Sequence, residues 1–281
     1  MLLIDFSQLA IASTAVCHQE DYAITSVRHR VWLTLGKYRK LFFKTYGDPI
    51  LCCDSASYWR KQLFPSYKAA RAAKRATSNT FSNACHYNIN TMREEFKQNS
   101  PYLVLTVEGA EADDIIAVLT ANATEGFFGR ESVLCVSGDK DFGQLAQYNG
   151  FRQYSPRLKD FVMFPADLDK ALAEHIFRGD KSDGIPNILS DDDTFITPGK
   201  KQKSLSKTLL DTYTVGIPAD LVLNYARNNS LINFKMIPSK VQNAILDEWR
   251  VQIASPKTRQ GLLSYFMHHR LNSLIPRIGD F

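Results

Sequence analysis

Carboxylate residues follow four separate apolar runs of this 281-residue chain. The runs cover residues 1–4, 50–53, 102–107 and 133–136, and the carboxylates after them are Asp5, Asp54, Glu111, Asp113, Asp114, Asp139 and Asp141. Several carboxylates side by side stay ionised only if cations lie between them. Because oxygen-only ligands favour Mg²⁺ or Mn²⁺ over zinc, such a group predicts a divalent-metal site. Two ions roughly 4 Å apart suit phosphoryl chemistry, since they clamp the attacking and leaving oxygens.

The elements around these residues predict how they meet. Short runs rich in Val, Ile and Leu, separated by helical stretches, indicate strands of a mostly parallel sheet that is flanked by helices. Helices are expected around residues 24–47 and 113–124, and residues 151–155 and 161–164 form a hairpin or edge strands. Ligands of such α/β sheets gather beyond the carboxyl ends of the strands, where the acidic residues lie.

Each acidic residue also has an ordinary structural explanation. An Asp after a buried strand commonly caps a helix or sits in a turn, and acidic residues at a helix start are favoured by its dipole. Recurrence at four strand ends favours one shared site over four independent caps. A further pair, Asp180 and Asp183, follows in the segment Arg178-Gly-Asp-Lys-Ser-Asp-Gly-Ile-Pro.

Basic residues are segregated from the acidic ones. No acidic residue lies between Asp54 and Glu94, although the net charge of the chain is only +5. Four cations recur at helical spacing near Trp59 and Tyr67, namely Lys68, Arg71, Lys74 and Arg75. A solvated basic helix is the ordinary explanation, but its position after a candidate metal ligand favours a phosphate-binding face with aromatic rings for bases.

Composition excludes several other classes. The five cysteines form no C-x-x-C pair, so zinc and disulfide frameworks are disfavoured and a reducing, cytoplasmic location is expected. No apolar run approaches the ~20 residues of a membrane span. The chain lacks a G-x-x-x-x-G-K-[ST] phosphate loop, which excludes a P-loop nucleotidase.

Five motifs in order resemble the flap endonuclease / 5′-nuclease family, and they are most similar to its T-even-type bacteriophage ribonuclease H branch. They are Leu-Ile-Asp5-Phe-Ser, the Asp54 to Arg71 segment with Tyr58-Trp59-Arg60 and Tyr67-Lys68, Glu111-Ala-Asp113-Asp114, Ser-Gly-Asp139-Lys-Asp141-Phe, and Gly-Asp180-Lys-Ser-Asp183-Gly-Ile-Pro. The resemblance implies a PIN-like nuclease core over residues 1–178 with a basic helical arch at about 55–100. It also implies a helical duplex-binding region over 179–281, within which 190–207 reads as a mobile loop.

The resemblance implies Mg²⁺-dependent 5′→3′ cleavage of flaps, nicked duplexes and RNA–DNA hybrids, as in primer removal during replication. It implies two Mg²⁺ ions, replaceable by Mn²⁺, and phosphate-stabilising roles for Lys68 and Arg60. The first metal group is Asp5, Asp54, Asp113 and Asp139, supported by Glu111 and Asp114, and the second is Asp141, Asp180 and Asp183. Nucleic-acid contacts are expected from Tyr67, Arg71, Lys74, Arg75, Lys200 and Lys201. A monomer that works with a single-strand DNA-binding protein and a sliding clamp in the host cytoplasm is also implied.

One departure from the family pattern concerns residues after Asp183. Many members continue with a Gly-rich helix–hairpin–helix that binds duplex backbone through a monovalent ion, whereas this chain has Asp191-Asp-Asp and a Lys-rich loop there. Two other functions remain open on the residues alone. One is a haloacid-dehalogenase-type phosphatase, which Ser7 disfavours because that chemistry uses a second Asp two residues after the first. The other is a non-catalytic nucleic-acid-binding replication protein, which the full acidic set disfavours.

Overall fold

The computed structural model describes residues 1–17, 23–69, 71, 80–126, 131–213, 216–255 and 257–281. The chain divides into two compact units, each assembled from several segments. Unit 1 comprises Met1–Ala56, Asn79–Val162 and Lys240–Phe281, and unit 2 comprises Ser57–Ser78 and Met163–Ser239. Among the helices of the described residues, none combines the length and apolarity that crossing a bilayer requires.

Unit 1 is built on a six-stranded sheet with the order β3-β2-β1-β4-β5-β6. The strands are β1 (Leu2–Asp5), β2 (Pro49–Cys53), β3 (Leu103–Thr106), β4 (Val133–Val136), β5 (Phe151–Ser155) and β6 (Asp160–Phe161). The first five are parallel, and β6 returns antiparallel to β5 at the edge. The carboxyl ends of β2, β1 and β4 are therefore neighbours at one edge of the sheet.

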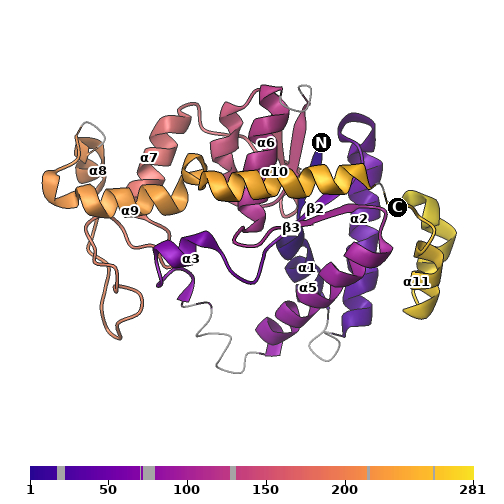
Figure 1. Cartoon of the computed structure of the whole chain (residues 1–281). Coiled ribbons are helices and arrows are strands. Elements are labelled where there is room, and N and C mark those ends of the chain that lie inside the picture. Colours follow the sequence, from indigo (N-terminus) through magenta and orange to yellow (C-terminus); the bar gives the residue numbers. More distant parts are fainter. Residues whose placement is uncertain (18–22, 70, 72–79, 127–130, 214–215, 256) are drawn as a thin grey trace. The chain divides into compact units, whose positions relative to one another are not determined.

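Helices cover both faces of this sheet, as Figure 1 shows. In β1, Leu2 and Ile4 join the core formed with α1 (Phe6–Ala15), α2 (Ile24–Tyr46) and α5 (Thr80–Asn99). Leu3 is equally buried but faces the other side, because successive strand residues point in opposite directions. Helix α6 (Ala112–Glu125) packs there against β1, β2 and β4. Burial on both faces explains why the strands are almost continuously apolar.

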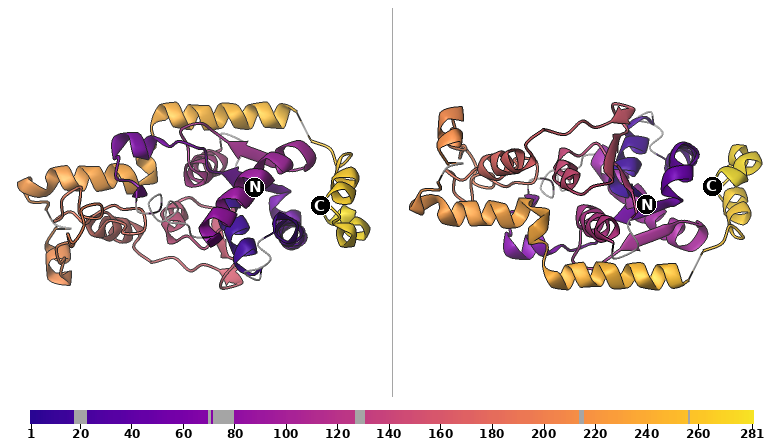
Figure 2. Two further views of the ribbon diagram at one scale, coloured as in Figure 1. Left: turned by 90° about the horizontal axis from the view of Figure 1, so that it is seen from below. Right: turned by 90° about the horizontal axis from the view of Figure 1, so that it is seen from above.

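The C-terminal part of unit 1 consists of α10 (Ser239–Ala254), α11 (Leu262–His268) and the 3₁₀ segment η5 (Asn272–Asp280). Figure 2 shows the end of the chain beside α2. The rings of Phe266 and Phe281 meet Trp32 of α2 edge-on, with centroids 5.2 and 5.3 Å away. Gly36 of α2 permits this approach, since a Cβ atom there would lie 2.8 Å from Phe281 Cε1.

Unit 2 is mainly helical. Its elements are α3 (Trp59–Leu63), α7 (Leu168–Arg178), α8 (Lys207–Tyr213), η3 (Ala219–Leu221), α9 (Val222–Ile232) and η4 (Phe234–Met236). One apolar cluster joins Phe64, Ile176 and Leu231. After α7 the chain turns at Gly179, whose φ is +65° and whose Cβ, if present, would meet the Ile185 carbonyl at 2.4 Å. Only glycine fits there, which fixes the turn that carries Asp180.

The predicted α/β class, with a mostly parallel sheet flanked by helices, is confirmed. The polar composition of residues 77–83 favours a loop in the sequence, but this prediction is wrong for residues 80–83, because α5 begins at Thr80 and continues to Asn99. Residues 77–79, and the part of the predicted arch that holds Lys74 and Arg75, lie outside the described residues. The boundary predicted near 178 falls within unit 2, between α7 and the Asp180 turn.

Candidate active site

The first acidic residue, Asp5, ends β1 and is 8% exposed. Its Oδ1 accepts a 3.0 Å hydrogen bond from the backbone N–H of Gln8, which makes it the N-cap of α1. Its Oδ2 accepts from the Ser137 hydroxyl at 3.2 Å. Asp5 can therefore cap α1 and still belong to the acidic group, because each of its oxygens accepts only one of these hydrogen bonds and keeps a lone pair for a cation.

Asp54 follows β2 and joins two helices to the sheet. Its Oδ2 accepts a 2.6 Å hydrogen bond from the Ser7 hydroxyl in the first turn of α1. Its Oδ1 accepts from the backbone N–H of Ala112, the first residue of α6, at 2.9 Å. The guanidinium of Arg93 donates to the Asp54 carbonyl at 3.2 Å. These contacts fix the carboxylate between the ends of β1 and β2.

Asp139 follows β4 and caps the 3₁₀ segment η2 (Lys140–Gln147), since its Oδ1 accepts from the Asp141 N–H at 3.0 Å. Its own N–H donates to the Ser137 hydroxyl oxygen at 3.1 Å. The same hydroxyl donates to Asp5, so Ser137 links the two carboxylate-bearing segments. The Gln153 amide donates to the Asp139 carbonyl at 2.6 Å, which holds this turn against β5.

The N-terminus of α6 supplies three more acidic residues. Glu111 is its N-cap, and the Glu111 N–H donates to Asp114 Oδ2 at 3.0 Å, one half of a capping box. Both side chains are buried, at 1% and 0% exposure. Asp113 lies between them in the first turn and is half-buried. Because the positive end of the helix dipole lies here, the acidic residues are partly compensated.

The pKa shifts of nearby groups indicate that these carboxylates lie close together. The pKa of Asp5 is raised to about 7, chiefly by burial and also by the charges of Asp54 and Asp139, while hydrogen bonds from Gln8 and Ser137 oppose the rise. The pKa of the Cys135 thiol in β4 is also raised, first by burial and then by charges that include Asp5, Asp113 and Asp139. Four strand-end and helix-start carboxylates therefore share one anionic region of unit 1.

Unit 2 contains the remaining predicted acidic pair. Asp180 accepts hydrogen bonds from the N–H and hydroxyl of Ser182, both at 2.7 Å, and lies 3.5 Å from His175 Nε2. The hydrogen bond with His175 is the main cause that lowers the Asp180 pKa. Asp183 accepts from the Tyr67 hydroxyl at 3.0 Å and from Arg71 at 2.5 Å. Asp180 is thus held in its charged form, and Asp183 is bound by a tyrosine and an arginine of the same unit.

The predicted cations of unit 2 occupy different environments. Lys68 Nζ lies 3.7 Å from Asp183 and 5.0 Å from the centre of the Tyr67 ring, on a backbone with φ +55°. Arg60 is only 3% exposed, and its Nε donates to the Leu231 carbonyl at 2.8 Å. The structure therefore places Lys68 among charged groups and Arg60 in the interior of unit 2.

The loop at 190–207 carries the lysines predicted to contact nucleic acid. Lys200 pairs with Asp191 at 2.8 Å and also with Asp193, while Lys201 is exposed. The loop contains no helix or strand before α8, but the Asn187 amide donates to the Lys203 carbonyl at 2.7 Å. The charge of Lys200 is therefore partly compensated within its own loop.

Several residues of this region were missed from the sequence. Ser7, Ser137 and Gln153 hold the carboxylate-bearing turns, and His175 contacts Asp180. Ser7 and Ser137 each lie two residues from a predicted ligand in the sequence, and this closeness could have indicated their roles. No local sequence feature marks Gln153 or His175, because their contacts depend on how β5 and α7 pack.

Residues 5–168 match the family model of the 5′-3′ exonuclease, N-terminal resolvase-like domain. This chain belongs to the 5′-3′ exonuclease family. Residues 165–281 of this 5′-3′ exonuclease match the model described as T4 RNase H, C terminal. The resemblance drawn from the five motifs is thereby confirmed, and the prediction of a nuclease enzyme is confirmed with it.

Individual relatives agree with the family. The chain is 29% identical over 298 residues to the ribonuclease H of Enterobacteria phage T4, an alignment that covers 99% of this chain and 95% of that one. It is 28% identical over 180 residues to a 5′-3′ exonuclease of Streptomyces coelicolor, covering 58% and 54% of the two chains.

Solved structures share the fold. One is a T5 5′-exonuclease with bound divalent metal ions (zinc), with a TM-score of 0.64, 15% identity, and coverage of 89% of this chain and 97% of that one. Another is the bacteriophage T5 flap endonuclease in a pseudo-enzyme-product complex with DNA and metal ions, with a TM-score of 0.63, 15% identity, and coverage of 89% and 96%.

Proposed function

We propose that this 5′-3′ exonuclease is a Mg²⁺-dependent, structure-specific 5′-nuclease. Its substrates are flap or nicked DNA and RNA–DNA hybrids, whose phosphodiesters it hydrolyses in the 5′→3′ direction during primer removal. The observation that carries the proposal is the convergence of Asp5, Asp54 and Asp139 at the carboxyl ends of three adjacent parallel strands. Family membership supplies the reaction class.

The donor set fits a hard divalent cation. Asp5, Asp54, Asp113 and Asp139 offer oxygen ligands only, and Asp5 sits in an environment where a proton or a cation must offset the neighbouring charges. Bound divalent ions supply polarisation of the phosphate and a bound water of lowered pKa. The T5 structures that share the fold contain divalent zinc, or DNA together with metal ions, which supports metal use here.

Other residues of unit 1 position these ligands. Ser7 and the N–H of Ala112 orient the Asp54 carboxylate, and Ser137 links Asp5 to the Asp139 turn. The capping box of Glu111 and Asp114 fixes the start of α6, which carries Asp113. The proposal also includes a second metal group, formed by Asp141, Asp180 and Asp183. It includes two Mg²⁺ ions in total, which Mn²⁺ can replace.

Cations of unit 2 supply charge for the phosphate. The Lys68 side chain is 16% exposed, and its ion pair with Asp183 at 3.7 Å is long enough to exchange for a phosphate oxygen. Arg60, also expected to act at the phosphate, is proposed to act by holding the α3 segment against Leu231. Nucleic-acid contact is proposed for Tyr67, Arg71, Lys74, Arg75, Lys200 and Lys201.

The duplex-binding role of residues 179–281 and the helical arch at 55–100 also belong to the proposal. A monomer that cooperates with a single-strand DNA-binding protein and a sliding clamp is the assembly proposed. The phage T4 relationship supports a phage-type replication enzyme of the host cytoplasm.

The test uses 5′-labelled flap DNA and a labelled RNA–DNA hybrid, each incubated with the protein in Mg²⁺ and in EDTA. Cleavage from the 5′ side in Mg²⁺, absent in EDTA, is expected for wild-type protein. Asp139→Asn should abolish cleavage and leave DNA affinity largely intact, because the substitution removes one ligand charge and keeps the side-chain shape.

Asp247→Asn is the matched control. Asp247 is an exposed carboxylate of unit 1 that pairs with Arg250 in α10, so its loss should leave cleavage unchanged. Equal activity of the Asp139→Asn and wild-type proteins would remove Asp139 from the metal site. Cleavage of neither substrate in any divalent ion would overturn the nuclease assignment of the site.

A further inference from the structure

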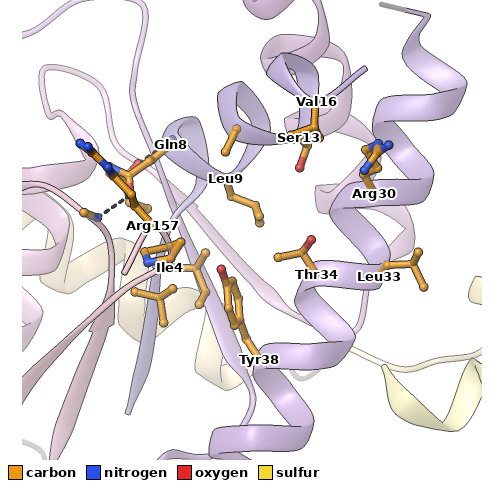
Figure 3. A pocket seen from close by; sticks show the side chains of 15 residues that line it. Ile4, Gln8, Leu9, Ser13, Val16, Arg30, Leu33, Thr34, Tyr38 and Arg157 are labelled. Carbon is orange, nitrogen blue, oxygen red and sulfur yellow. Dashed lines mark hydrogen bonds between the residues drawn. The ribbon is translucent and has the colours of Figure 1, made fainter. Parts of the chain in front are cut away.

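A cavity of about 480 Å³ opens beside the acidic group, between α1 and α2 (Figure 3). All of its lining residues belong to unit 1. Its apolar lining includes Ile4, Leu9, Val16, Leu33 and Val136. A volume of this size is within the range that holds a small organic ligand.

Hydroxyl groups project into this cavity from both helices. Figure 3 shows the Tyr38 hydroxyl rising from α2 into the space and the Ser13 hydroxyl facing it from α1. Both side chains are 5% exposed, and among the described residues neither hydroxyl has a hydrogen-bond partner. Since both residues line the cavity, their hydroxyls are available to hydrogen-bond a ligand inside it.

Two arginines stand at opposite sides of the cavity, Arg30 from α2 and Arg157 from the turn after β5 (Figure 3). Both are exposed, and neither guanidinium forms an ion pair or hydrogen bond with any described residue. Guanidinium groups bind phosphate through paired N–H donors and remain charged at all relevant pH values. The rim therefore suits an anion.

We propose that this cavity binds a single nucleotide, with the base against the apolar lining and the phosphate at the rim that carries the arginines. Inorganic phosphate would leave the apolar lining uncovered, and an apolar ligand would leave the arginines and the Tyr38 hydroxyl without a partner. A nucleotide satisfies all three features, because a base is a flat aromatic group with polar edges.

The position of the cavity connects it to the proposed nuclease reaction. Asp5 forms part of its wall, and Gln8, which also lines it, accepts a hydrogen bond from the Gly138 N–H beside Asp139. An unpaired nucleotide next to the scissile phosphate would thus lie in reach of the cavity, and this part of the inference rests on the proposed function. A released nucleoside monophosphate has the same chemistry and would enter the same space.

The test measures binding without catalysis. Calorimetric titration in EDTA with AMP, adenosine and inorganic phosphate should show AMP binding most tightly. Arg30→Ala and Arg157→Ala should each weaken AMP by about tenfold or more, as expected for loss of a charge-assisted contact. Arg250→Ala, which removes an exposed arginine of α10, should leave AMP binding unchanged.

Filling the cavity gives a second variant that removes no polar group. Ala12→Phe places a ring into the cavity from the exposed side of α1 and should abolish AMP binding, whereas Ala15→Phe, one turn on and outside the lining, should not. AMP binding that is equal in Ala12→Phe and Ala15→Phe, or equal for AMP and phosphate, would overturn the inference.

The source of the nucleotide is tested with a flap that carries 2-aminopurine beside the cleavage position, bound to Asp139→Asn protein. Fluorescence that changes on binding, and loses this change with Ala12→Phe, supports a nucleotide of the substrate strand. AMP binding without a fluorescence change supports the released nucleotide. Failure of both overturns the proposal, whereas cleavage by Asp139→Asn would count only against the proposed metal site.

Discussion

The Ser7 hydroxyl donates a 2.6 Å hydrogen bond to Oδ2 of Asp54. This contact joins the start of α1 to the end of β2, and so couples the segment after Asp5 to the next carboxylate of the group. In the proposed metal site, Ser7 therefore orients Asp54 without contacting the ion itself.

Ser7→Ala should therefore weaken Mn²⁺ binding by roughly 10- to 100-fold while the fold is preserved. Titration of Mn²⁺ by electron paramagnetic resonance measures the affinity, and circular dichroism reports the fold. Ser7→Thr, which keeps the hydroxyl, should restore most of the affinity. If Ser7→Ala binds Mn²⁺ as wild type does, the hydrogen bond has no part in orienting Asp54.

The metal-free protein should lose stability as the pH rises. Burial and neighbouring charges raise the Asp5 pKa from 3.8 to about 7 in the folded state. The contribution of Asp5 to the free energy of unfolding is therefore full below pH ~4, decreases as the pH rises, and is lost once the pH has passed about 7. In EDTA, urea unfolding at pH 5 and pH 8 should differ by ~2 kcal/mol, since one pKa unit corresponds to about 1.4 kcal/mol and adjacent carboxylates share the effect.

Asp5→Asn should shrink this difference, because asparagine caps α1 equally well and does not titrate. Asp247→Asn is the control and should keep the wild-type difference. An unchanged pH dependence in Asp5→Asn would show that Asp5 is ionised in the folded, metal-free state.

Lys68→Ala should slow the chemical step more than binding. Loss of a positioned cation near the reacting phosphate typically costs 10²–10³ in rate. Single-turnover cleavage at saturating enzyme measures the chemical step, and a binding titration in Ca²⁺ measures affinity. Lys181→Ala removes an exposed lysine of the same unit and should change neither. A Lys68→Ala protein that cuts at the normal rate but binds poorly would make Lys68 a binding residue.

Gly36→Ala should destabilise unit 1 although alanine is the better helix former. Its Cβ would lie 2.8 Å from Phe281 Cε1, so the ring must shift within the Trp32 cluster. The expected cost is ~1–2 kcal/mol by urea unfolding, net of a helix-propensity gain of about 1 kcal/mol. Gly279→Ala meets no atom within 4 Å and should be near neutral. A more stable Gly36→Ala protein would contradict the tight packing of Phe281.

The parts of the site predicted from sequence are those with a local signature. Buried apolar runs followed by carboxylates identified β1, β2 and β4 and the residues Asp5 and Asp139, because strand ends of a parallel sheet must meet. The start of α6 was recognisable from its acidic first turn.

The parts that were not predictable depend on packing between distant segments. Nothing in the local pattern around residue 281 indicates that its ring lies on Trp32, and the Gln153 amide reaches Asp139 only because β5 pairs with β4. Helix α5 begins at Thr80 within a segment whose polar composition indicated a loop, and its buried residues Cys85 and Met92 show that packing on the sheet decides the outcome.

All five cysteines are free thiols buried in unit 1. Burial raises the pKa of Cys52, Cys53 and Cys135, which keeps these sulfurs in the unreactive protonated form at neutral pH. Maleimide dyes should therefore label a newly introduced surface thiol selectively, with no need to remove native ones. Leu158→Cys, at a position 66% exposed and adjacent to Arg157, would carry a fluorophore at the mouth of the cavity and follow its occupancy in real time.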